Sequence, residues 1–408
     1  MTPYLRIFQN KPFRTFWLGF TFSSFGDAVT RVALTWFVYE QTKSAEALGW
    51  LMLCYTGPVV VGGLIAGWLL DRFDRRWVIL SDNLVRGVAV ALIPLLNAVG
   101  RLELWHVYAV AAVYGFLMMI SLAGGPALIP SLVSRDELAT ANALEMLSFT
   151  IGGVLGPALA GVFIGVIGAP NVVLVDAVSY FAFALALWFV RLPAEPMHPA
   201  ASQTYGLQHA VRLLLGNRVL FSTTFMFMAA NIGIGVLAVW LPILSDQELG
   251  GGSELYGTLL GLWALGEVVS SFVAGGRAFR LSLGMLICLA QILSGAAVGL
   301  MLVGPNVWTV GLGLILLGAF SAPLTIWAQT LRMQVIPERL RGRTFALLRM
   351  LMQSGGPVGS AVGGLALPLV GLPVMILASA LVIGLPGAIG VQVSELRSGD
   401  VHDGVPAE

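Results

Sequence analysis

Long apolar runs, separated by short polar or charged connections, dominate this sequence. Twelve runs have about twenty residues or more, which is the length an α-helix needs to cross a bilayer. Their approximate limits are 13–39, 46–70, 77–99, 104–128, 140–167, 171–191, 219–244, 255–277, 281–303, 306–331, 344–369 and 372–393. Glycine, proline or charge marks most connections. The pattern predicts an all-α membrane protein with twelve transmembrane helices.

One longer polar segment interrupts the apolar pattern at 191–218. It begins with a proline- and alanine-rich stretch, and 205–216 has the composition of a short amphipathic helix lying on the membrane surface. The predicted organisation is an N-terminal six-helix bundle at 1–190, a cytoplasmic linker at 191–218, a C-terminal six-helix bundle at 219–394 and a cytoplasmic tail at 395–408.

Composition supports a membrane protein and argues against several other classes. Only 11% of the residues are charged and 57% are hydrophobic, whereas soluble domains carry about 25% charged residues. The net charge of +1 gives no basic face for nucleic acid. The two cysteines and four histidines are scattered, so we expect no metal and no cofactor. Without a phosphate-binding loop, a nucleophile elbow or a paired-carboxylate constellation, we expect no enzyme.

The distribution of lysine and arginine predicts the orientation. With the N-terminus in the cytoplasm, seventeen of the 22 basic residues fall in inner segments, and only Lys43 and Arg101 fall in outer loops. Positive residues collect on the cytoplasmic side of membrane proteins. The sequence therefore predicts an integral protein of the plasma (inner) membrane, with both termini cytoplasmic.

The two halves show a weak internal repeat. Residues 47–67 align with 255–275, so that Gly49 meets Gly257, and residues 144–147 align with 348–351. Two parallel six-helix repeats with a substrate site near the bilayer midplane are a recurring transporter architecture. We therefore expect the two bundles to be pseudo-symmetric.

Asp27 and Arg31 lie within the first predicted span. A charge at this depth costs about 2.5–3.5 kcal/mol on insertion scales and usually faces the bundle interior. Their spacing suits an i,i+4 ion pair. One interpretation makes Asp27 a protonatable group in a transport cavity. The other is a permanent structural pair that closes the outer half of the helix.

Glu267 lies near the middle of the eighth predicted span. It has no lysine or arginine within a helical turn, which suits a proton relay or an anchor for a cationic substrate. The alternative is a neutral acid that is hydrogen-bonded to a neighbouring helix. For Asp176, near the outer end of the sixth span, a structural role is expected. For Glu145 and Arg349 we expect snorkelling or a bridge between the halves.

Seven charges gather between residues 71 and 86. Five of them form an aqueous loop between the second and third spans. The last two, Asp82 and Arg86, are one turn apart inside the third span, and we expect a buried pair that faces the second or fourth span. Such a cluster suggests a cytoplasmic charge lock formed by Asp71, Arg72, Arg75, Arg76, Asp82 and Arg86.

Two motifs carry a resemblance to the major facilitator superfamily. Gly67, Asp71, Arg72, Arg75 and Arg76 resemble its loop 2–3 signature, roughly G-x-x-x-D-R-x-G-R-R, although Asp74 stands where glycine is usual. The fifth span resembles the exporter signature G-x-x-x-G-P-x-x-G-G. The matching residues are Gly152, Gly156, Pro157 and Gly161, and Ala160 replaces one glycine of the signature.

Residues 10–49 and 130–147 resemble the drug:proton antiporter-3 branch of that superfamily, which includes macrolide-efflux proteins and enterobactin exporters. The resemblance covers most of residues 10–190. Many drug antiporters also carry an arginine in the fourth helix, and residues 104–128 contain none. The coupling role of that arginine therefore has no counterpart at this place.

The resemblance implies a secondary active exporter of amphipathic or lipophilic small molecules, drug-like or siderophore-like, exchanged for protons by alternating access. It implies a monomer in contact with membrane lipid, with helices 1, 4, 7 and 10 lining the cavity. The cavity candidates are Asp27, Arg31, Glu267, Asn231, Met118, Phe227 and Trp327. The alternative is a lysophospholipid transporter, which Gly26-Asp27 and Ala141-Asn142 also resemble.

Overall fold

The structure is a computed structural model that describes residues 3–190, 207–276, 281–337 and 340–398. A few side chains inside helices, including that of Asp71, lie outside this description. Throughout the described residues the regular structure is helical. The chain forms two compact units: unit 1 is Met1–Lys43, Cys54–Ala201 and Gly251–Gly261, and unit 2 is Ser44–Leu53, Ser202–Gly250 and Leu262–Glu408.

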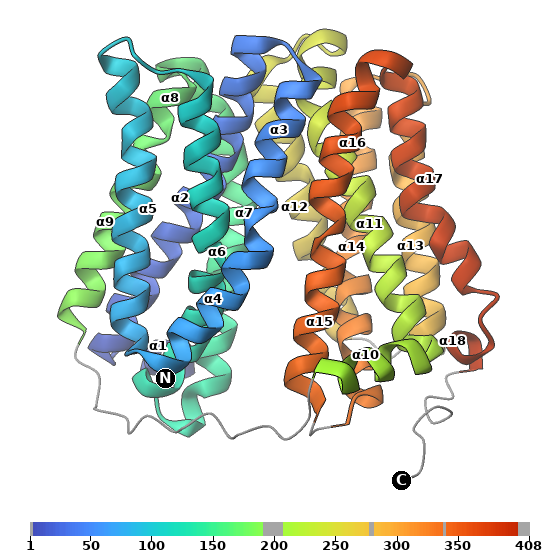
Figure 1. Ribbon diagram of the computed structural model, residues 1–408, viewed down its shortest axis with the longest axis horizontal. Coiled ribbons are helices and arrows are strands. Elements are labelled where there is room, and N and C mark those ends of the chain that lie inside the picture. The colour runs from blue at the N-terminus through green and yellow to red at the C-terminus, as the bar shows by residue number, and fades with distance from the viewer. Residues whose placement is uncertain (1–2, 191–206, 277–280, 338–339, 399–408) are drawn as a thin grey trace. The chain divides into compact units, whose positions relative to one another are not determined.

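Unit 1 contains long helices that run side by side (Figure 1) and short helices at their ends. They are α1 (Pro3–Ile7), α2 (Lys11–Thr42), α4 (Pro58–Arg72), α5 (Arg75–Ala98), α6 (Leu104–Leu132), α7 (Leu138–Ile167), α8 (Ala169–Val172) and α9 (Leu174–Phe189). The end of α3 (Ala45–Thr56) and the start of α12 (Gly252–Gly276) also belong to this unit.

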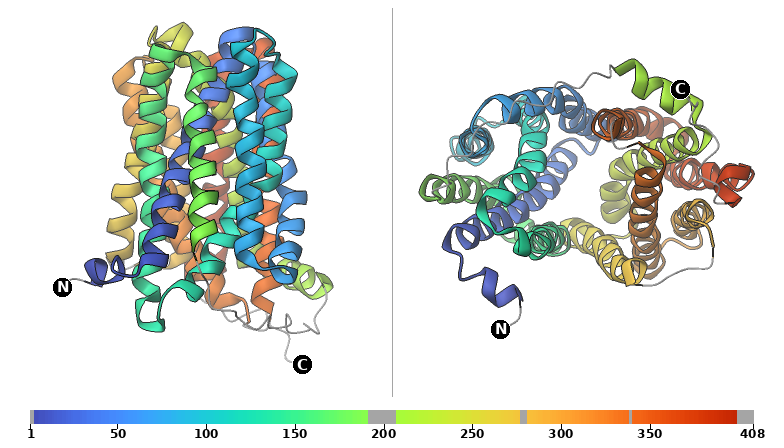
Figure 2. Two further views of the ribbon diagram at one scale, coloured as in Figure 1. Left: turned by 90° about the vertical axis from the view of Figure 1, so that its left-hand side faces the viewer. Right: turned by 90° about the horizontal axis from the view of Figure 1, so that it is seen from below.

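Unit 2 contains the first part of α3 and most of α12. Its other helices are α10 (Leu207–Gly216), α11 (Arg218–Ile243), α13 (Leu283–Leu300), α14 (Val307–Val335), α15 (Arg341–Gln353), α16 (Gly355–Val370), α17 (Leu372–Gly390) and α18 (Ser394–Ser398). The predicted helix at 205–216 is present as α10, which lies across the ends of the long helices of its unit (Figure 2). Ala210 and Leu214 hold it on an apolar cluster with Leu220 and Leu331.

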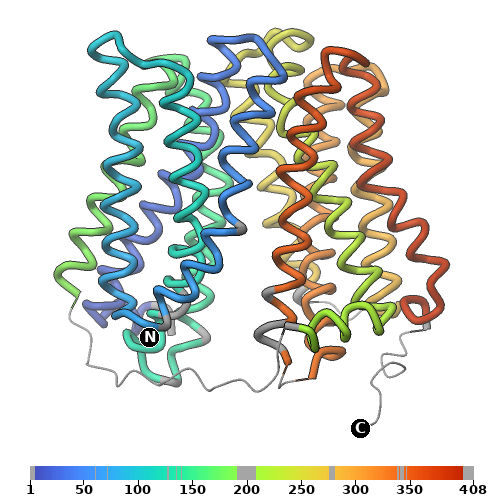
Figure 3. The backbone as a smooth tube through the Cα atoms, in the orientation of Figure 1, coloured from blue at the N-terminus to red at the C-terminus, as the bar shows by residue number. Residues whose placement is uncertain are grey.

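The all-α membrane fold predicted from the sequence is confirmed. Ten helical segments in the described residues are long and apolar enough to cross a membrane. The two remaining predicted spans correspond to α2, which carries Asp27 and Arg31, and to α15 with α16. The second span is divided at Gly57 into α3 and α4, which follow each other in the same direction (Figure 3). Pro58 starts α4 and has no N–H to continue the hydrogen bonds of α3.

Glycines set the closest helix contacts in both units. In unit 1, a Cβ on Gly152 would stand 2.7 Å from the Ser24 carbonyl oxygen of α2, and one on Gly161 would stand 3.1 Å from Cα of Gly257. In unit 2, a Cβ on Gly49 would stand 3.1 Å from Cα of Gly364. Small residues allow helix backbones to approach this closely in membranes. Gly49 and Gly257, which the sequence repeat aligns, thus each allow a close helix contact, one in each unit.

Aromatic side chains fill the core of unit 1 below its polar centre. Phe16 and Phe20 of α2 stack at 5.6 Å, and Phe183 of α9 lies 6.0 Å from Phe20. All three are at most 4% exposed. Their burial fixes α2 against α9, which places the polar residues of these two helices opposite each other.

Candidate functional site

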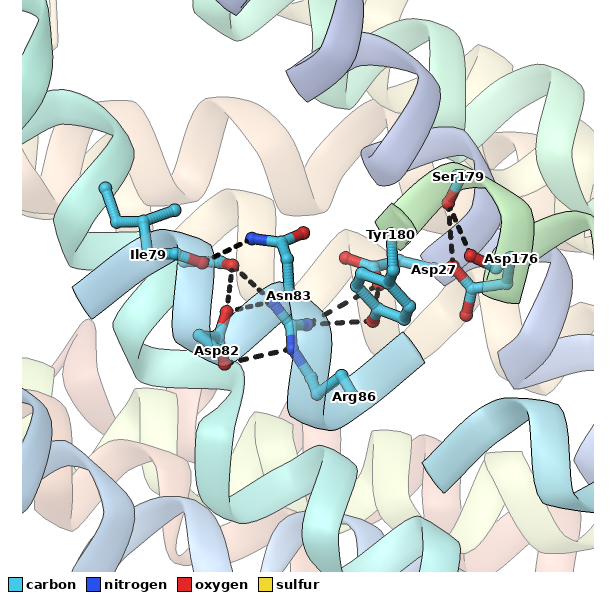
Figure 4. A network of polar contacts seen from close by, with 9 residues as sticks. Asp27, Ile79, Asp82, Asn83, Arg86, Asp176, Ser179 and Tyr180 are labelled. Carbon is cyan, nitrogen blue, oxygen red and sulfur yellow. Dashed lines mark hydrogen bonds and ion pairs between the residues drawn. The ribbon is translucent and has the colours of Figure 1, made fainter. Parts of the chain in front are cut away.

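A buried arginine on α5 forms the centre of a polar network in unit 1 (Figure 4). The Arg86 side chain is 1% exposed. Its Nε donates to Oδ1 of Asp82 at 3.1 Å, and its Nη2 donates to Oδ2 at 2.5 Å. Asp82 and Arg86 therefore form the buried pair that their one-turn spacing predicts, in a two-pronged geometry that suits guanidinium and carboxylate.

The same guanidinium also contacts α2 and α9. Nη1 of Arg86 donates to the Tyr180 hydroxyl at 2.9 Å and lies 3.6 Å from Oδ1 of Asp27. The Tyr180 hydroxyl in turn donates to that Asp27 oxygen. Arg86 thus joins a carboxylate of its own helix to one on α2.

Helix α6 completes the network through Ser121. The Ser121 hydroxyl accepts from Nη2 of Arg86 and donates to Oδ2 of Asp82 at 2.9 Å. Tyr114 of α6 and Tyr180 present their rings to the guanidinium, with centroids 5.6 and 4.6 Å away. The pair therefore faces the fourth span, as expected, and also the first and sixth. Removing one partner of such a buried pair would leave an uncompensated charge.

Asp27 is the exposed end of this network. Its side chain is 27% exposed, against 1% for Arg86 and 0% for Asp82. The expected Asp27–Arg31 ion pair is absent from the ion pairs of the described residues, where Asp27 pairs with Arg86 instead. Asp27 and Arg31 have the i,i+4 spacing on α2, but the Asp27 carboxylate contacts Tyr180 and Arg86 of neighbouring helices instead.

Sequence reasoning missed several residues of this site. Tyr180 and Ser121 carry no sequence signal, because single hydroxyl residues are ordinary in membrane helices. Asp176 is buried beside them: its Oδ1 accepts from the Ser179 hydroxyl at 3.1 Å, and it packs on Gly26. A structural role was expected for Asp176, and its position next to Asp27 brings a third carboxyl group to the site (Figure 4).

Unit 2 holds the second membrane-embedded carboxyl candidate. Oε1 of Glu267 on α12 accepts from the Ser321 hydroxyl of α14 at 3.2 Å. These helices meet closely, since a Cβ on Gly318 would stand 2.9 Å from the Glu267 amide nitrogen. Glu267 therefore has the interhelical hydrogen bond that the alternative interpretation expects, while its side chain stays partly exposed.

The other cavity candidates have contacts of their own. The Asn231 Nδ2 donates to the Phe227 carbonyl one turn earlier on α11, at 2.9 Å. The Phe227 ring lies 4.6 Å from the guanidinium carbon of Arg332. Trp327 lines an apolar pocket of unit 2, and Met118 is partly buried on α6 of unit 1. The structure therefore brings Asp27, Asp82 and Arg86 together, but distributes the rest over two units.

The charged loop is built around the ends of α4 and α5. Oδ1 of Asp74 accepts from the Arg76 amide at 2.9 Å and caps α5, which accounts for an acid where the family signature has glycine. Arg76 donates to the carbonyls of Leu187 and Trp188 at the end of α9. Arg72 and Arg75 are exposed, and a Cβ on Gly67 would meet open space. The Asp71 side chain lies outside the described residues.

Glu145 differs from the expectation of snorkelling or bridging. Its side chain is buried on α7, with the residue 6% exposed, and its Oε1 has no hydrogen bond in the described part of the chain. Neighbouring contacts explain the burial: a Cβ on Gly125 would stand 3.1 Å from the Phe20 ring and 3.3 Å from that oxygen. Arg349 is exposed. The packing of α2 and α6 over α7 encloses Glu145.

An apolar pocket of about 520 Å³ opens on unit 2. Helices α12, α13 and α14 form it, and its lining includes Val269, Leu289, Ile315, Phe320 and Trp327. Such a surface accepts hydrocarbon rather than polar groups.

Buried charges inside two helical units define a polytopic membrane protein of the transporter type. The family profile of the Major Facilitator Superfamily matches residues 16–360, and the chain belongs to that superfamily. Solved structures with this fold include the nucleoside transporter NupG, with a TM-score of 0.75, 14% identity and coverage of 94% of this chain and 99% of that one. A bacterial homologue of ferroportin matches with a TM-score of 0.72, 17% identity and coverage of 95% and 98%.

Curated relatives match over most of their length. The enterobactin exporter EntS of Salmonella choleraesuis is 26% identical, covering 80% of this chain and 79% of its own. The staphyloferrin A transporter of Staphylococcus aureus is 25% identical, covering 80% and 82%. The multidrug efflux pump Tap of Mycolicibacterium fortuitum is 25% identical, covering 92% and 94%. The predicted resemblance to efflux proteins of this superfamily is confirmed.

Proposed function

We propose that this protein is a secondary active transporter that exports amphipathic or lipophilic small molecules, siderophore-like or drug-like, in exchange for protons. The observation that carries the export function is similarity over most of the chain: the matches to a relative named as an enterobactin exporter and to one named as a multidrug efflux pump cover 79% and 94% of those relatives. Alternating access, with two six-helix repeats moving about a midplane site, is the mechanism that this architecture favours.

The Asp27 network supports the proton-coupling part of the proposal. Asp27 is the one network carboxylate with a substantially exposed side chain, at 27%, and it is tied to a buried cation on α5. A proton on Asp27 would weaken its attraction to Arg86 and free the Tyr180 hydroxyl, so protonation changes the bonding between α2, α5 and α9. Here Arg86 supplies the cation beside Asp27, in a chain that has no arginine in its fourth span.

We propose an inner-membrane location, cytoplasmic termini and a monomer. Seventeen basic residues on the inner side against two outside support the orientation. The charged loop with Asp71, Arg72, Arg75 and Arg76 would then face the cytoplasm and act as a gate latch. The contacts of Arg76 with the end of α9 support a fixed loop on that side. Asp71→Asn should shift the population towards the inward-open state, measured as distances between spin labels across the cytoplasmic face.

A second candidate is lysophospholipid transport. The apolar pocket of about 520 Å³ on α12–α14 favours it, because an acyl chain could lie there while the headgroup stays outside. Export of siderophores and drugs remains the preferred function, since the relatives with those activities match most of the chain.

The test compares a deletion strain with its complemented parent against lipophilic drugs, siderophores and lysolipids. We expect higher retention of a drug or siderophore in the deletion strain and pH-driven efflux by the purified protein in proteoliposomes. Lysolipid movement alone would favour the second candidate. Unchanged retention of every compound would contradict both functions.

A further inference from the structure

Arg31 is the one exposed residue in a buried stretch of α2. All remaining residues from Ala28 to Tyr39 are buried. Arg31 lies eleven residues before the end of α2 at Thr42, which is about 17 Å along the helix axis and therefore deep in a bilayer. A guanidinium at this depth faces water or a polar ligand rather than lipid. Arg31 is thus an exposed cation on an otherwise buried stretch of unit 1.

The guanidinium of Arg31 has spare hydrogen-bonding capacity. Within the described residues, no carboxylate lies within 4.0 Å of it and no side-chain hydrogen bond uses its donors. Asp27, an acidic neighbour on the same helix, is held by Arg86 and Tyr180. Two other membrane-embedded arginines differ: Arg86 is 1% exposed and Arg332 is 4% exposed. Arg31 is therefore available to a ligand in a way that these two are not.

The side chains around Arg31 in unit 1 are held in place by packing. Its electrostatic neighbours there are Tyr55, Tyr114 and Tyr256, besides Asp27. Tyr55 and Tyr114 stack at 4.9 Å, and Tyr256 stacks on Trp36 at 6.1 Å. The three tyrosines are at most 8% exposed, so packing fixes their positions. An arginine held in such a frame can bind a planar acidic group with two parallel hydrogen bonds.

We propose that Arg31 binds an acidic group of the transported molecule, a carboxylate or an ionised phenolate, and so makes the protein prefer anionic over cationic amphiphiles. This inference rests on the proposed function, because it assigns the charge of the molecule that is exported. Arg86 and Tyr180 hold the Asp27 carboxylate in the network, so the Arg31 guanidinium stays open to the ligand.

Binding of two matched probes tests the charge preference. The full-length protein in nanodiscs is titrated with 1-naphthoate and with 1-naphthylmethylammonium, which share a ring system and differ in charge. The wild type should bind the carboxylate at least about tenfold more tightly than the ammonium probe, as one charge-assisted contact provides. Arg31→Gln should remove that preference, and Arg31→Lys should keep part of it.

Lys43→Gln is the matched control. Lys43 is an exposed cation just beyond α2, so its loss changes the net charge equally without touching the site. Each variant is first checked for a single folded peak and for its melting temperature. The proposal is overturned if wild-type protein does not bind 1-naphthoate, or if Arg31→Gln binds it as tightly as the wild type does. It is also overturned if Arg31→Gln weakens the binding of both probes equally, or if Lys43→Gln has the same effect as Arg31→Gln.

Transport measurements separate this inference from the proposed function. If Arg31-dependent binding of 1-naphthoate is found but no compound is exported, the export function fails and the anion site stands. If the wild type exports drugs or siderophores in response to a pH gradient while Arg31→Gln does not alter probe selectivity, the export function stands and the anion site fails.

Discussion

The Arg86 guanidinium on α5 lies 3.6 Å from the Asp27 carboxylate on α2 and forms two hydrogen bonds with Asp82 on its own helix. One buried cation therefore holds two carboxylates, of which one is fully enclosed and the other is partly exposed. Protonation of the exposed carboxylate changes the charge balance of the whole network. This relation between packing and charge underlies the predictions on unit 1.

Removing Arg86 alone should destabilise the protein. Arg86→Met leaves Asp82 buried without its cation, which costs about 3–5 kcal/mol. The double variant Asp82→Leu/Arg86→Met should recover most of this loss, because an apolar pair needs no charge compensation. Thermal unfolding in detergent, followed by tryptophan fluorescence, measures both. Arg72→Gln, which removes an exposed arginine, is the control. A double variant as unstable as Arg86→Met would contradict this account.

Tyr180 and Asp27 should be energetically coupled. Tyr180→Phe removes the hydroxyl that donates to Asp27 and accepts from Arg86, and a double-mutant cycle with Asp27→Asn should give a coupling of about 0.5–3 kcal/mol. The cycle is measured from unfolding of the purified protein. A cycle of Asp27→Asn with Trp308→Phe, a residue 85% exposed on unit 2, should give no coupling. Additive effects of Tyr180→Phe and Asp27→Asn would mean that the contact contributes nothing.

Glu267→Gln should abolish proton-coupled export and leave folding intact. The amide keeps a group that can accept from Ser321, so the α12–α14 contact survives while the titratable proton is lost. Efflux driven by a pH gradient in proteoliposomes is the measurement. Glu254→Gln, an exposed carboxyl on the same helix, should transport normally. Undiminished pH-driven efflux by Glu267→Gln would exclude this carboxyl group from coupling.

Two neighbouring glycines of α7 should respond to alanine with opposite signs. Gly152→Ala places a methyl group 2.7 Å from the Ser24 carbonyl oxygen and should destabilise the protein. A Cβ on Gly153 would have nothing within 4 Å, so Gly153→Ala should stabilise the protein by about 0.5–1 kcal/mol through helix propensity. Melting temperatures of the two variants decide the matter. Equal shifts would show that the glycine face does not set the α2–α7 distance.

Much of the fold could be predicted from the sequence because a membrane imposes a strong length rule. The apolar spans, and the glycine, proline and charged residues between them, predict where the helices lie. The spacing of Asp82 and Arg86 predicts their buried pair. The boundaries inside spans were harder to predict: the break at Gly57 and the capping role of Asp74 depend on local backbone hydrogen bonds. Glu145 was also misjudged, because its burial comes from neighbouring helices rather than from its position in the span.

The sequence by itself determined the number and length of the apolar spans, the charge bias of the connections and the positions of Asp27, Arg31 and Glu267 within those spans. These follow from one-dimensional rules of bilayer thickness and helical rise. Only the tertiary structure decided which charges meet. Asp27 bonds to Tyr180 and Arg86 rather than pairing with Arg31, because helix packing brings α5 and α9 to its side. The pairing of charges depends on contacts between segments far apart in the chain, which no spacing rule along one helix contains.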